Sequence, residues 1–283
     1  MDPLQFLTAA RVAVVAGKGG VGKTTVTAVL ARAAAASGLR VLAVELDGKP
    51  TLADLLGDVP NLTITPQAAL AEYLETHGLK RVAKRLASSG VIDVVATAAP
   101  GIDDIVVLGK IKQLERSGDY DLIVVDGPAA GHAITFLMSA QSLLDTVRGG
   151  PLRTQATEVA EMMRDAERVQ VVLVTLPETT PVNEMIETAY ALEERVHAHL
   201  GPVVVNGIDL GAMLAADAAP AGSAMRVAAE FRNARRALHL AESTRLSDEL
   251  ALPQIHLPLV AGSHLDLALV NELAAAWLAG GTR

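Results

Sequence analysis

One short loop constrains the fold of this chain more than any other feature. Residues 16–26 read AGKGGVGKTTV, and within them Gly17 to Thr24 fit the phosphate-loop pattern G-x-x-x-x-G-K-[S/T]. The loop follows RVAVVAG (residues 11–17), an apolar run typical of a strand buried on both faces. It precedes a helical stretch that ends near Gly38. A strand, a glycine-rich loop and a helix in this order predict a nucleotide-binding α/β fold.

The rest of the chain repeats this alternation. Val-rich runs alternate with helical stretches, which predicts a doubly wound, mostly parallel sheet with helices on both faces. We expect strands over residues 11–17, 39–47, 91–98, 121–126, 169–176, 202–206 and 253–259. We expect helices over residues 23–38, 67–87, 102–117, 131–146, 153–168, 181–198, 224–246 and 264–279. We predict one domain over 1–283, with helical elaborations near 139–168 and 207–252, where connections are longer than a crossover needs.

The composition excludes several classes of protein. The chain has 283 residues, of which 51% are apolar and only 2% aromatic, and its net charge is −8. Because nucleic-acid binding needs excess positive charge and aromatic rings for stacking, we expect no nucleic-acid partner. The chain contains no cysteine, which excludes disulfides and thiolate metal sites.

The sequence also bears on location. No apolar run approaches the roughly 18 residues of a membrane span. The N-terminal stretch MDPLQFLTAARVAVV lacks the basic region and the cleavage site of a signal peptide. We therefore expect a cytoplasmic protein with no direct membrane insertion.

The phosphate-loop residues have defined chemical tasks. The glycines let the backbone bend so that successive N–H groups point inward, and the helix N-terminus adds partial positive charge. Lys23 is expected to contact the β- and γ-phosphates, and Thr24 to offer its hydroxyl to Mg²⁺. The predicted nucleotide contacts in the loop are Gly17, Gly19, Gly20, Val21, Gly22, Lys23, Thr24 and Thr25.

Two acidic residues follow predicted strands. Asp126 ends DLIVVD, at the edge where open α/β sheets bind ligands. We expect it to hold Mg²⁺ through water, because Mg²⁺ gives up its waters reluctantly. Asp47 ends LRVLAVELD and is the candidate to position the attacking water and to reach Mg²⁺ through water, with Glu45 on the same strand face as the alternative. For either aspartate, capping of a turn or helix is the structural alternative.

The fuller pattern G-K-G-G-V-G-K-T-T resembles the deviant Walker A loop of the SIMIBI-class P-loop ATPases. This class includes ArsA (the arsenite-pump ATPase), the tail-anchored-protein targeting ATPases, MinD, ParA and the nitrogenase iron protein. In these proteins the early lysine reaches across a dimer interface to the nucleotide of the facing subunit, and the resemblance assigns that catalytic role to Lys18. Such a cation acts as an arginine finger does, by neutralising charge on the transferring phosphoryl group. A solvated loop lysine is the alternative.

The chain is most similar to the ArsA and tail-anchored-targeting branch. The second switch of that branch reads D-T-A-P-T-G-H-T-L-R, and here Asp126 to His132 keep the Asp, the Gly and the His. The first switch reads D-P-A-H-N-L-S-D, and here Asp47 and Asp54 keep both acids while the His-Asn pair is lost. Hydrolysis is expected if Asp47 positions the water, whereas the cross-subunit contacts of the lost pair are not carried over. LAEYLETHGLKRVAKRL, VLGKIKQLER and LPETTPVNEM resemble actinobacterial members, some of which pair as two dissimilar chains.

The base of the nucleotide is predicted from Asn206. In this branch an Asn at the end of the corresponding strand contacts adenine. The stretch NGID also echoes the guanine-reading pattern N-K-x-D, with Gly207 in place of the lysine. The missing lysine and the resemblance both favour ATP, and a simple Asn-Gly turn is a third interpretation. By resemblance, residues from Pro258 to Gly262 lie near the ribose or base.

The resemblance implies a Mg²⁺-dependent dimeric switch that hydrolyses ATP and couples nucleotide state to a partner, a client or a membrane-associated protein. ArsA contains two ATPase halves, but this chain has one phosphate loop, so a copy or a related ArsA-like chain must supply the second. Two alternatives are a weakly active regulatory subunit of a heteromeric pair, motivated by the altered first switch, and a MinD- or ParA-like positioning ATPase. The basic C-terminal helix of MinD and the basic surface of ParA are not evident. Thiolate binding of arsenite and a zinc-clasped dimer are excluded, because the chain has no cysteine.

Overall fold

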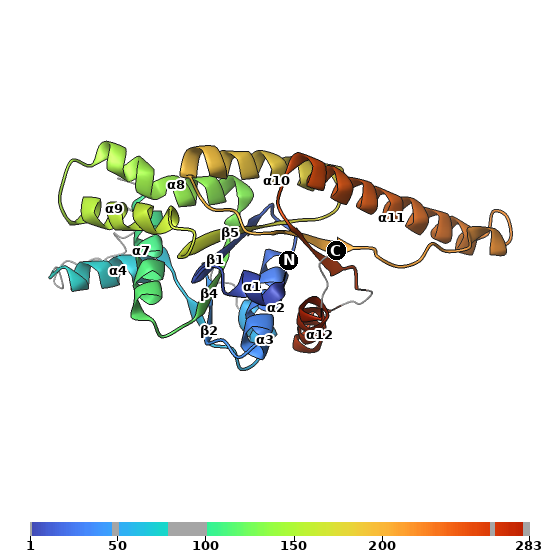
Figure 1. The fold of residues 1–283 in the computed structure, drawn as a ribbon, viewed down its shortest axis with the longest axis horizontal. Helices are drawn as coiled ribbons and strands as arrows, with labels where there is room; N and C mark the ends of the chain where they lie inside the picture. The colour runs from blue at the N-terminus through green and yellow to red at the C-terminus, as the bar shows by residue number, and fades with distance from the viewer. Residues whose placement is uncertain (1, 47–50, 79–100, 261–263, 280–283) are drawn as a thin grey trace.

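A computed structural model describes residues 2–46, 51–78, 101–260 and 264–279, and it confirms the predicted α/β architecture (Figure 1). Within these residues, seven strands form one sheet in the order β3-β2-β4-β1-β5-β6-β7, and neighbouring strands pair in parallel. In chain order the strands are Val12–Gly17 (β1), Val41–Glu45 (β2), Asn61–Thr63 (β3), Leu122–Ala129 (β4), Val169–Thr175 (β5), Val203–Ile208 (β6) and Gln254–Pro258 (β7). The chain completes the strands on one side of β1 before those on the other. The loop after β1 therefore leaves the sheet where the strand order reverses.

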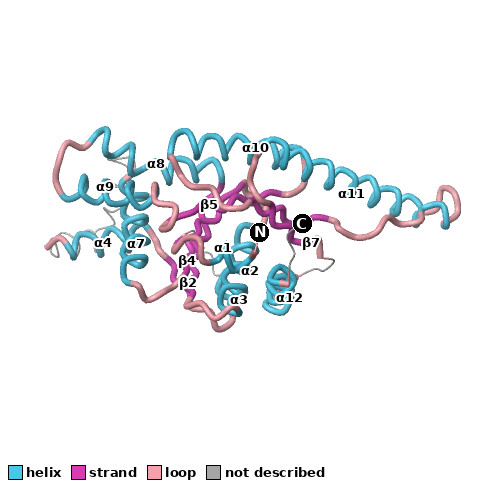
Figure 2. The backbone as a smooth tube through the Cα atoms, viewed as in Figure 1, coloured by secondary structure: helices cyan, strands magenta, loops and turns pink. Residues whose placement is uncertain are grey.

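Helices cover both faces of the sheet (Figures 1 and 2). On one face lie α1 (Pro3–Leu7), α2 (Lys23–Ala36), α3 (Thr51–Leu56) and α12 (Leu267–Leu278). On the other face lie α4 (Pro66–Thr76), α7 (Ile102–Ser117), α8 (Ala130–Thr146), α9 (Pro151–Met163) and α10 (Thr179–Ala191). The long helix α11 (Ala224–Glu249) begins beyond the sheet, and its C-terminal half packs on α10, as Figure 1 shows. Among the described residues, no helix combines the length and the apolar character that a membrane span requires.

The central strand β1 separates two hydrophobic cores. Val12 and Val14 belong to the core beneath α7 to α10, whereas Ala13 and Val15 belong to the core beneath α2 and α12. All six residues of β1 are buried. Burial on both faces explains why the strand reads as a continuous apolar run and not as an alternating pattern.

The elements differ from the sequence-based expectation in a few places. The strand β3 and the helices α1 and α3 were not predicted, because segments of three to six residues are too short to show a period. The helix predicted over 153–168 ends at Met163. The helix predicted over 181–198 ends at Ala191 and continues as a π-helical turn, Leu192–Val196. The predicted strand 91–98 and the second half of the predicted helix 67–87 lie outside the described residues.

The two long connections contain helices of different character. Residues 139–168 include α9, which packs against α7 and α8. Residues 207–252 include a 3₁₀ turn, Ala216–Ala218, and α11, which has 26 residues. The division of the chain into one domain with two elaborations stays a prediction.

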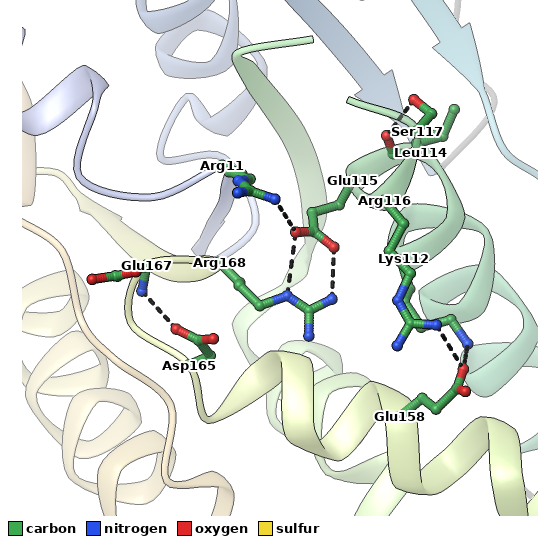
Figure 3. A network of polar contacts seen from close by, with 10 residues as sticks. All are labelled: Arg11, Lys112, Leu114, Glu115, Arg116, Ser117, Glu158, Asp165, Glu167 and Arg168. Atoms are coloured by element: carbon green, nitrogen blue, oxygen red, sulfur yellow. Dashed lines mark hydrogen bonds and ion pairs between the residues drawn. The ribbon is translucent and has the colours of Figure 1, made fainter. Parts of the chain in front are cut away.

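A buried carboxylate fastens α7 to the amino ends of two strands (Figure 3). The side chain of Glu115 is only 1% exposed, and it accepts hydrogen bonds from Arg168 Nε and Nη2 at 3.2 and 2.6 Å and from Arg11 Nη1 at 3.2 Å. The hydrogen bond with Glu115 is the main cause that raises the pKa of Arg168. Because Arg11 precedes β1 and Arg168 precedes β5, this network lies at the opposite end of the strands from the phosphate loop.

Replacing Arg168 should test how much this network contributes to stability. Arg168→Met removes the guanidinium and leaves the buried Glu115 carboxylate with Arg11 alone, so the free energy of unfolding should fall by about 3 kcal/mol. The control is Arg116→Met, which removes a half-exposed contact with Glu158 in the same region and should cost less than about 1 kcal/mol. Urea unfolding at pH 7 measures both values. Equal losses in the two variants would contradict this account.

Candidate active site

Glycines at both ends of the phosphate loop allow it to lie close against two neighbouring strands. A Cβ on Gly17 would lie 2.4 Å from the carbonyl oxygen of Val174 in β5, so no side chain fits there. A Cβ on Gly22 would lie 2.3 Å from Nδ2 of Asn206 in β6. Gly22 also has a φ of 89°, in the left-handed region that favours glycine. Both ends of the loop therefore require glycine.

The middle of the loop is open on its outer side. A Cβ on Gly19 or Gly20 would meet no heavy atom within 4 Å. The first turn of α2, which begins at Lys23, follows directly, and its N-cap Gly22 has no side chain to satisfy the first N–H groups. These N–H groups and the helix dipole favour an anion at this end of the helix. The predicted contact residues from Gly17 to Thr25 thus surround one open loop, although their roles toward a nucleotide stay predictions.

Lys23 already lies across the loop. Its Nζ donates a hydrogen bond of 3.4 Å to the carbonyl oxygen of Lys18. This position suits a lysine that contacts phosphates held by the loop N–H groups.

Thr24 and Asp126, which are 102 residues apart in the sequence, are in direct contact. Thr24 Oγ1 donates to Asp126 Oδ2 at 2.7 Å, and Thr27 Oγ1 donates to Oδ1 at 3.4 Å. A hydroxyl and a carboxylate oxygen are the ligands that Mg²⁺ prefers, and Mg²⁺ commonly takes only one or two carboxylates plus phosphates and waters. The residues present therefore fit the predicted Mg²⁺ site.

The strand that carries Asp126 is longer than predicted. Asp126 pairs in register with Val15 of β1 and Glu45 of β2, and β4 then continues to Ala129 with an irregular register. The continuation needs Gly127, because a Cβ there would lie 2.5 Å from the carbonyl oxygen of Val15. The expectation that the strand ends at Asp126 was therefore wrong.

The water-positioning carboxylate remains a prediction. Asp47 lies outside the described residues. Its alternative, Glu45, ends β2, is buried, and lies beside Asp126 across the β2–β4 pairing. The structure thus places one of the two candidates next to the predicted metal ligand.

Asn206 is tied to the phosphate loop. Its Nδ2 donates a hydrogen bond of 2.9 Å to the carbonyl oxygen of Val21. The register of β6 against β7 shifts between Asn206 and Ile208, and Gly207 between them has a φ of 71°. Pro258, the last residue of β7, pairs with Ile208. The described part of the chain therefore brings Asn206 to the loop and Pro258 to the adjacent strand, whereas residues 261 and 262 are outside it.

Asp209, the acid of the guanine-like pattern, is engaged within the chain. Its carboxylate accepts hydrogen bonds from Arg232 Nε and Nη2, both at 3.0 Å, and from the Gly211 N–H at 2.9 Å. The hydrogen bond with Arg232 is the main cause that lowers the pKa of Asp209. A guanine-reading aspartate must offer its carboxylate to the base, so this pairing favours adenine.

Two further polar contacts at this end of the sheet were not predicted from the sequence. Lys18 Nζ forms an ion pair with Oε1 of Glu184 in α10. His132 Nε2 lies 3.6 Å from Oδ1 of Asp104 in α7, and burial is the main cause that raises the pKa of Asp104. Glu184 falls in LPETTPVNEM, a stretch noted for its resemblance but not for a role, and no local pattern marks Asp104.

Comparison with known proteins agrees with this geometry. The profile of the ArsA family, described as anion-transporting ATPases, matches residues 10–149. ATPase BagA of Mycobacterium tuberculosis is 30% identical, and the alignment covers 98% of this chain and 95% of BagA. The chain belongs to the ArsA ATPase family. It is therefore an ATPase with a P-loop NTPase fold, as the resemblance of its loop implied.

Other relatives match smaller parts of this ArsA-family ATPase. The arsenical pump-driving ATPase of Escherichia coli is 31% identical over 62% of this chain and 31% of its own length. ATPase GET3B of Arabidopsis thaliana is 26% identical over 63% of this chain and 59% of its own length. These two relatives support the predicted ArsA and tail-anchored-targeting branch.

Two alanine substitutions should show, by their effects on stability, that the loop is tightly packed at Gly17 and open at Gly19. Gly17→Ala should lower the free energy of unfolding by about 1–3 kcal/mol, because its methyl group would overlap the Val174 carbonyl and force β1 from β5. Gly19→Ala is the matched control and should stay within about 0.5 kcal/mol of the parent, since space is open there. Urea unfolding of both variants measures the difference. A Gly19→Ala variant as unstable as Gly17→Ala would refute the open loop.

Proposed function

We propose that this ATPase binds Mg·ATP at the loop between β1 and α2 and hydrolyses it as part of a pair of chains. The observation that carries the proposal is the hydrogen bond of 2.7 Å between Thr24 and Asp126. It sets a hydroxyl that can bind Mg²⁺ directly, and a carboxylate that can hold it through water, beside a glycine loop and a helix N-terminus that suit phosphates.

Each residue around the loop has a proposed task. The loop N–H groups and the N-terminus of α2 hold the phosphates, and Lys23 contacts the β- and γ-phosphates. Thr24, together with Asp126 through water, holds Mg²⁺, which when bound neutralises phosphate charge and orients the reacting groups. Asp47, which follows β2, positions the attacking water and reaches Mg²⁺ through water, and Glu45 is the alternative for positioning the water.

The preference for adenine rests on two contacts. Asn206 lies against the phosphate loop through its bond to Val21. Its proposed contact with adenine follows from the resemblance to the family. The carboxylate of Asp209 accepts hydrogen bonds from Arg232, so it is not turned to a guanine base. Pro258, on the strand beside Asn206, is proposed to lie near the ribose or base.

The proposed functional unit is a pair of ATPase chains, formed with a second copy or a related ArsA-like chain. Lys23 lies across its own loop, whereas the Lys18 side chain is 41% exposed and turns to α10. A half-exposed lysine at the rim of the loop can be delivered to a facing nucleotide. Finger-type cations of this kind contribute about 10³–10⁵ in rate.

We also propose that nucleotide state is passed to a partner or client protein through α7. Asp126 lies on β4, β4 runs directly into α8, and His132 at the start of α8 contacts Asp104 of α7. A shift of the Mg²⁺ ligand would therefore move α7 and the helices α4 and α9 that pack on it. We place this activity in the cytoplasm, where Mg·ATP is supplied, and the partner can be a membrane-associated protein.

Nucleotide competition tests the proposed substrate. Mg·ATP should bind at least about tenfold more tightly than Mg·GTP, which corresponds to about 1.4 kcal/mol. Chelation of Mg²⁺ should weaken ATP binding, and Asp126→Asn should remove most of that Mg²⁺ dependence because it takes away the carboxylate that Thr24 contacts. Displacement of a fluorescent ATP analogue measures each affinity. Equal or tighter binding of GTP would overturn the assignment.

Mixing two inactive variants tests the pair. Lys18→Ala should bind ATP as the parent does, because Lys23 and the loop N–H groups remain, while hydrolysis should fall about 10³-fold or more. Lys23→Ala should be defective at its own loop but can still supply Lys18 to a facing chain. The mixture should therefore release phosphate faster than either variant alone. If the natural partner is a related chain, the same test is run by mixing each variant with that partner. No recovery, together with linear dependence of parent activity on protein concentration, would rule out the trans role.

A further inference from the structure

The ion pair between Lys18 and Glu184 connects the phosphate loop with α10. Glu184 is held in place because Val182, Met185 and Ile186 on the same helix are buried in the core beneath α10. Lys18 comes from the loop, whose next two glycines face open space. The side chains of Lys18 and Glu184 are each 41% exposed, so the contact is accessible from outside the chain.

The ammonium group of Lys18 lies on Glu184 of its own chain, whereas a nucleotide in a facing chain lies across the interface between the two chains. If Lys18 serves a facing nucleotide, its ion pair with Glu184 within its own chain must open first. We propose that Glu184 is a positioning residue that holds Lys18 within its own chain until the phosphates of a facing chain displace it. This inference rests on the proposed trans role of Lys18, and it commits to a second copy of this chain as the facing partner.

The strength of the ion pair limits how far it can oppose this exchange. A half-exposed ion pair contributes only about 1.4- to 5-fold to an equilibrium constant. The pair with Glu184 is therefore weak enough to open, yet it opposes every association that draws Lys18 away. Glu184 would raise the protein concentration needed for activity without changing the rate of the assembled pair.

A charge-neutral substitution of Glu184 tests this role. In Glu184→Gln, the protein concentration for half-maximal ATP hydrolysis should fall by about 2- to 25-fold, because a symmetric pair no longer has to open two such contacts. The plateau rate should equal that of the parent. Sedimentation velocity with Mg²⁺ and a non-hydrolysable ATP analogue should show the same shift in self-association.

A matched control and a double variant isolate the contact. Glu187→Gln removes the same charge from an exposed position nearly one turn further along α10. Its protein concentration for half-maximal ATP hydrolysis should equal that of the parent. In sedimentation, adding Glu184→Gln to Lys18→Ala should produce no further shift, since the lysine it releases is absent. Thermal unfolding checks that each variant folds as the parent does.

Each contrary result has a separate meaning. An unchanged or raised half-maximal concentration in Glu184→Gln, with Lys18→Ala still inactive, would overturn the role of Glu184 and leave the trans role of Lys18 intact. Full activity in Lys18→Ala would overturn both. A parent chain that does not associate with Mg²⁺ and the ATP analogue would overturn the inference for two copies of this chain.

Discussion

The contact between Gly17 and the carbonyl oxygen of Val174 fixes where the phosphate loop leaves the sheet. A Cβ at this position would lie only 2.4 Å from that oxygen. Because glycine has no Cβ, β1 can stay paired with β5 up to its last residue. The loop then turns outward at the reversal of strand order, where α2 begins. Thr24 and Asp126 meet because this geometry brings α2 over the end of β4. The geometry of the candidate site thus depends on a backbone approach that only glycine permits.

Charged contacts of two kinds lie at opposite ends of the sheet. At the amino ends of the strands, Glu115 is enclosed by Arg168 and Arg11 and serves the structure. At the carboxyl ends, the contact of Lys18 with Glu184 joins two half-exposed side chains, and the contact of His132 joins an exposed imidazole to the mostly buried Asp104. The half-exposed pair of Lys18 and Glu184 is weak enough to exchange partners, which the proposed nucleotide-dependent switch requires.

The sequence predicted those parts that depend on local order along the chain. The strand, loop and helix at Gly17 to Lys23, and the acid at Asp126, follow patterns that can be read within a few residues. Contacts between distant segments could not be predicted in this way: Lys18 and Glu184 are 166 residues apart, and Asp209 and Arg232 come from a loop and a long helix. Such pairs depend on how distant segments pack, which local patterns in a single sequence do not reveal. The same holds for the extension of β4 past Asp126, which depends on a close approach at Gly127.

The central claim is that Lys18 leaves Glu184 to serve the nucleotide of a facing chain. A crystal or cryo-EM structure of the assembled protein with Mg²⁺ and a non-hydrolysable ATP analogue tests it most directly, through the partner of Lys18 Nζ. The account predicts that Lys18 Nζ lies within hydrogen-bond distance of a phosphate oxygen in the facing chain, with Thr24 and Asp126 around Mg²⁺ in that same site. A Lys18 that stays on Glu184, or that contacts only the nucleotide of its own chain, would contradict it.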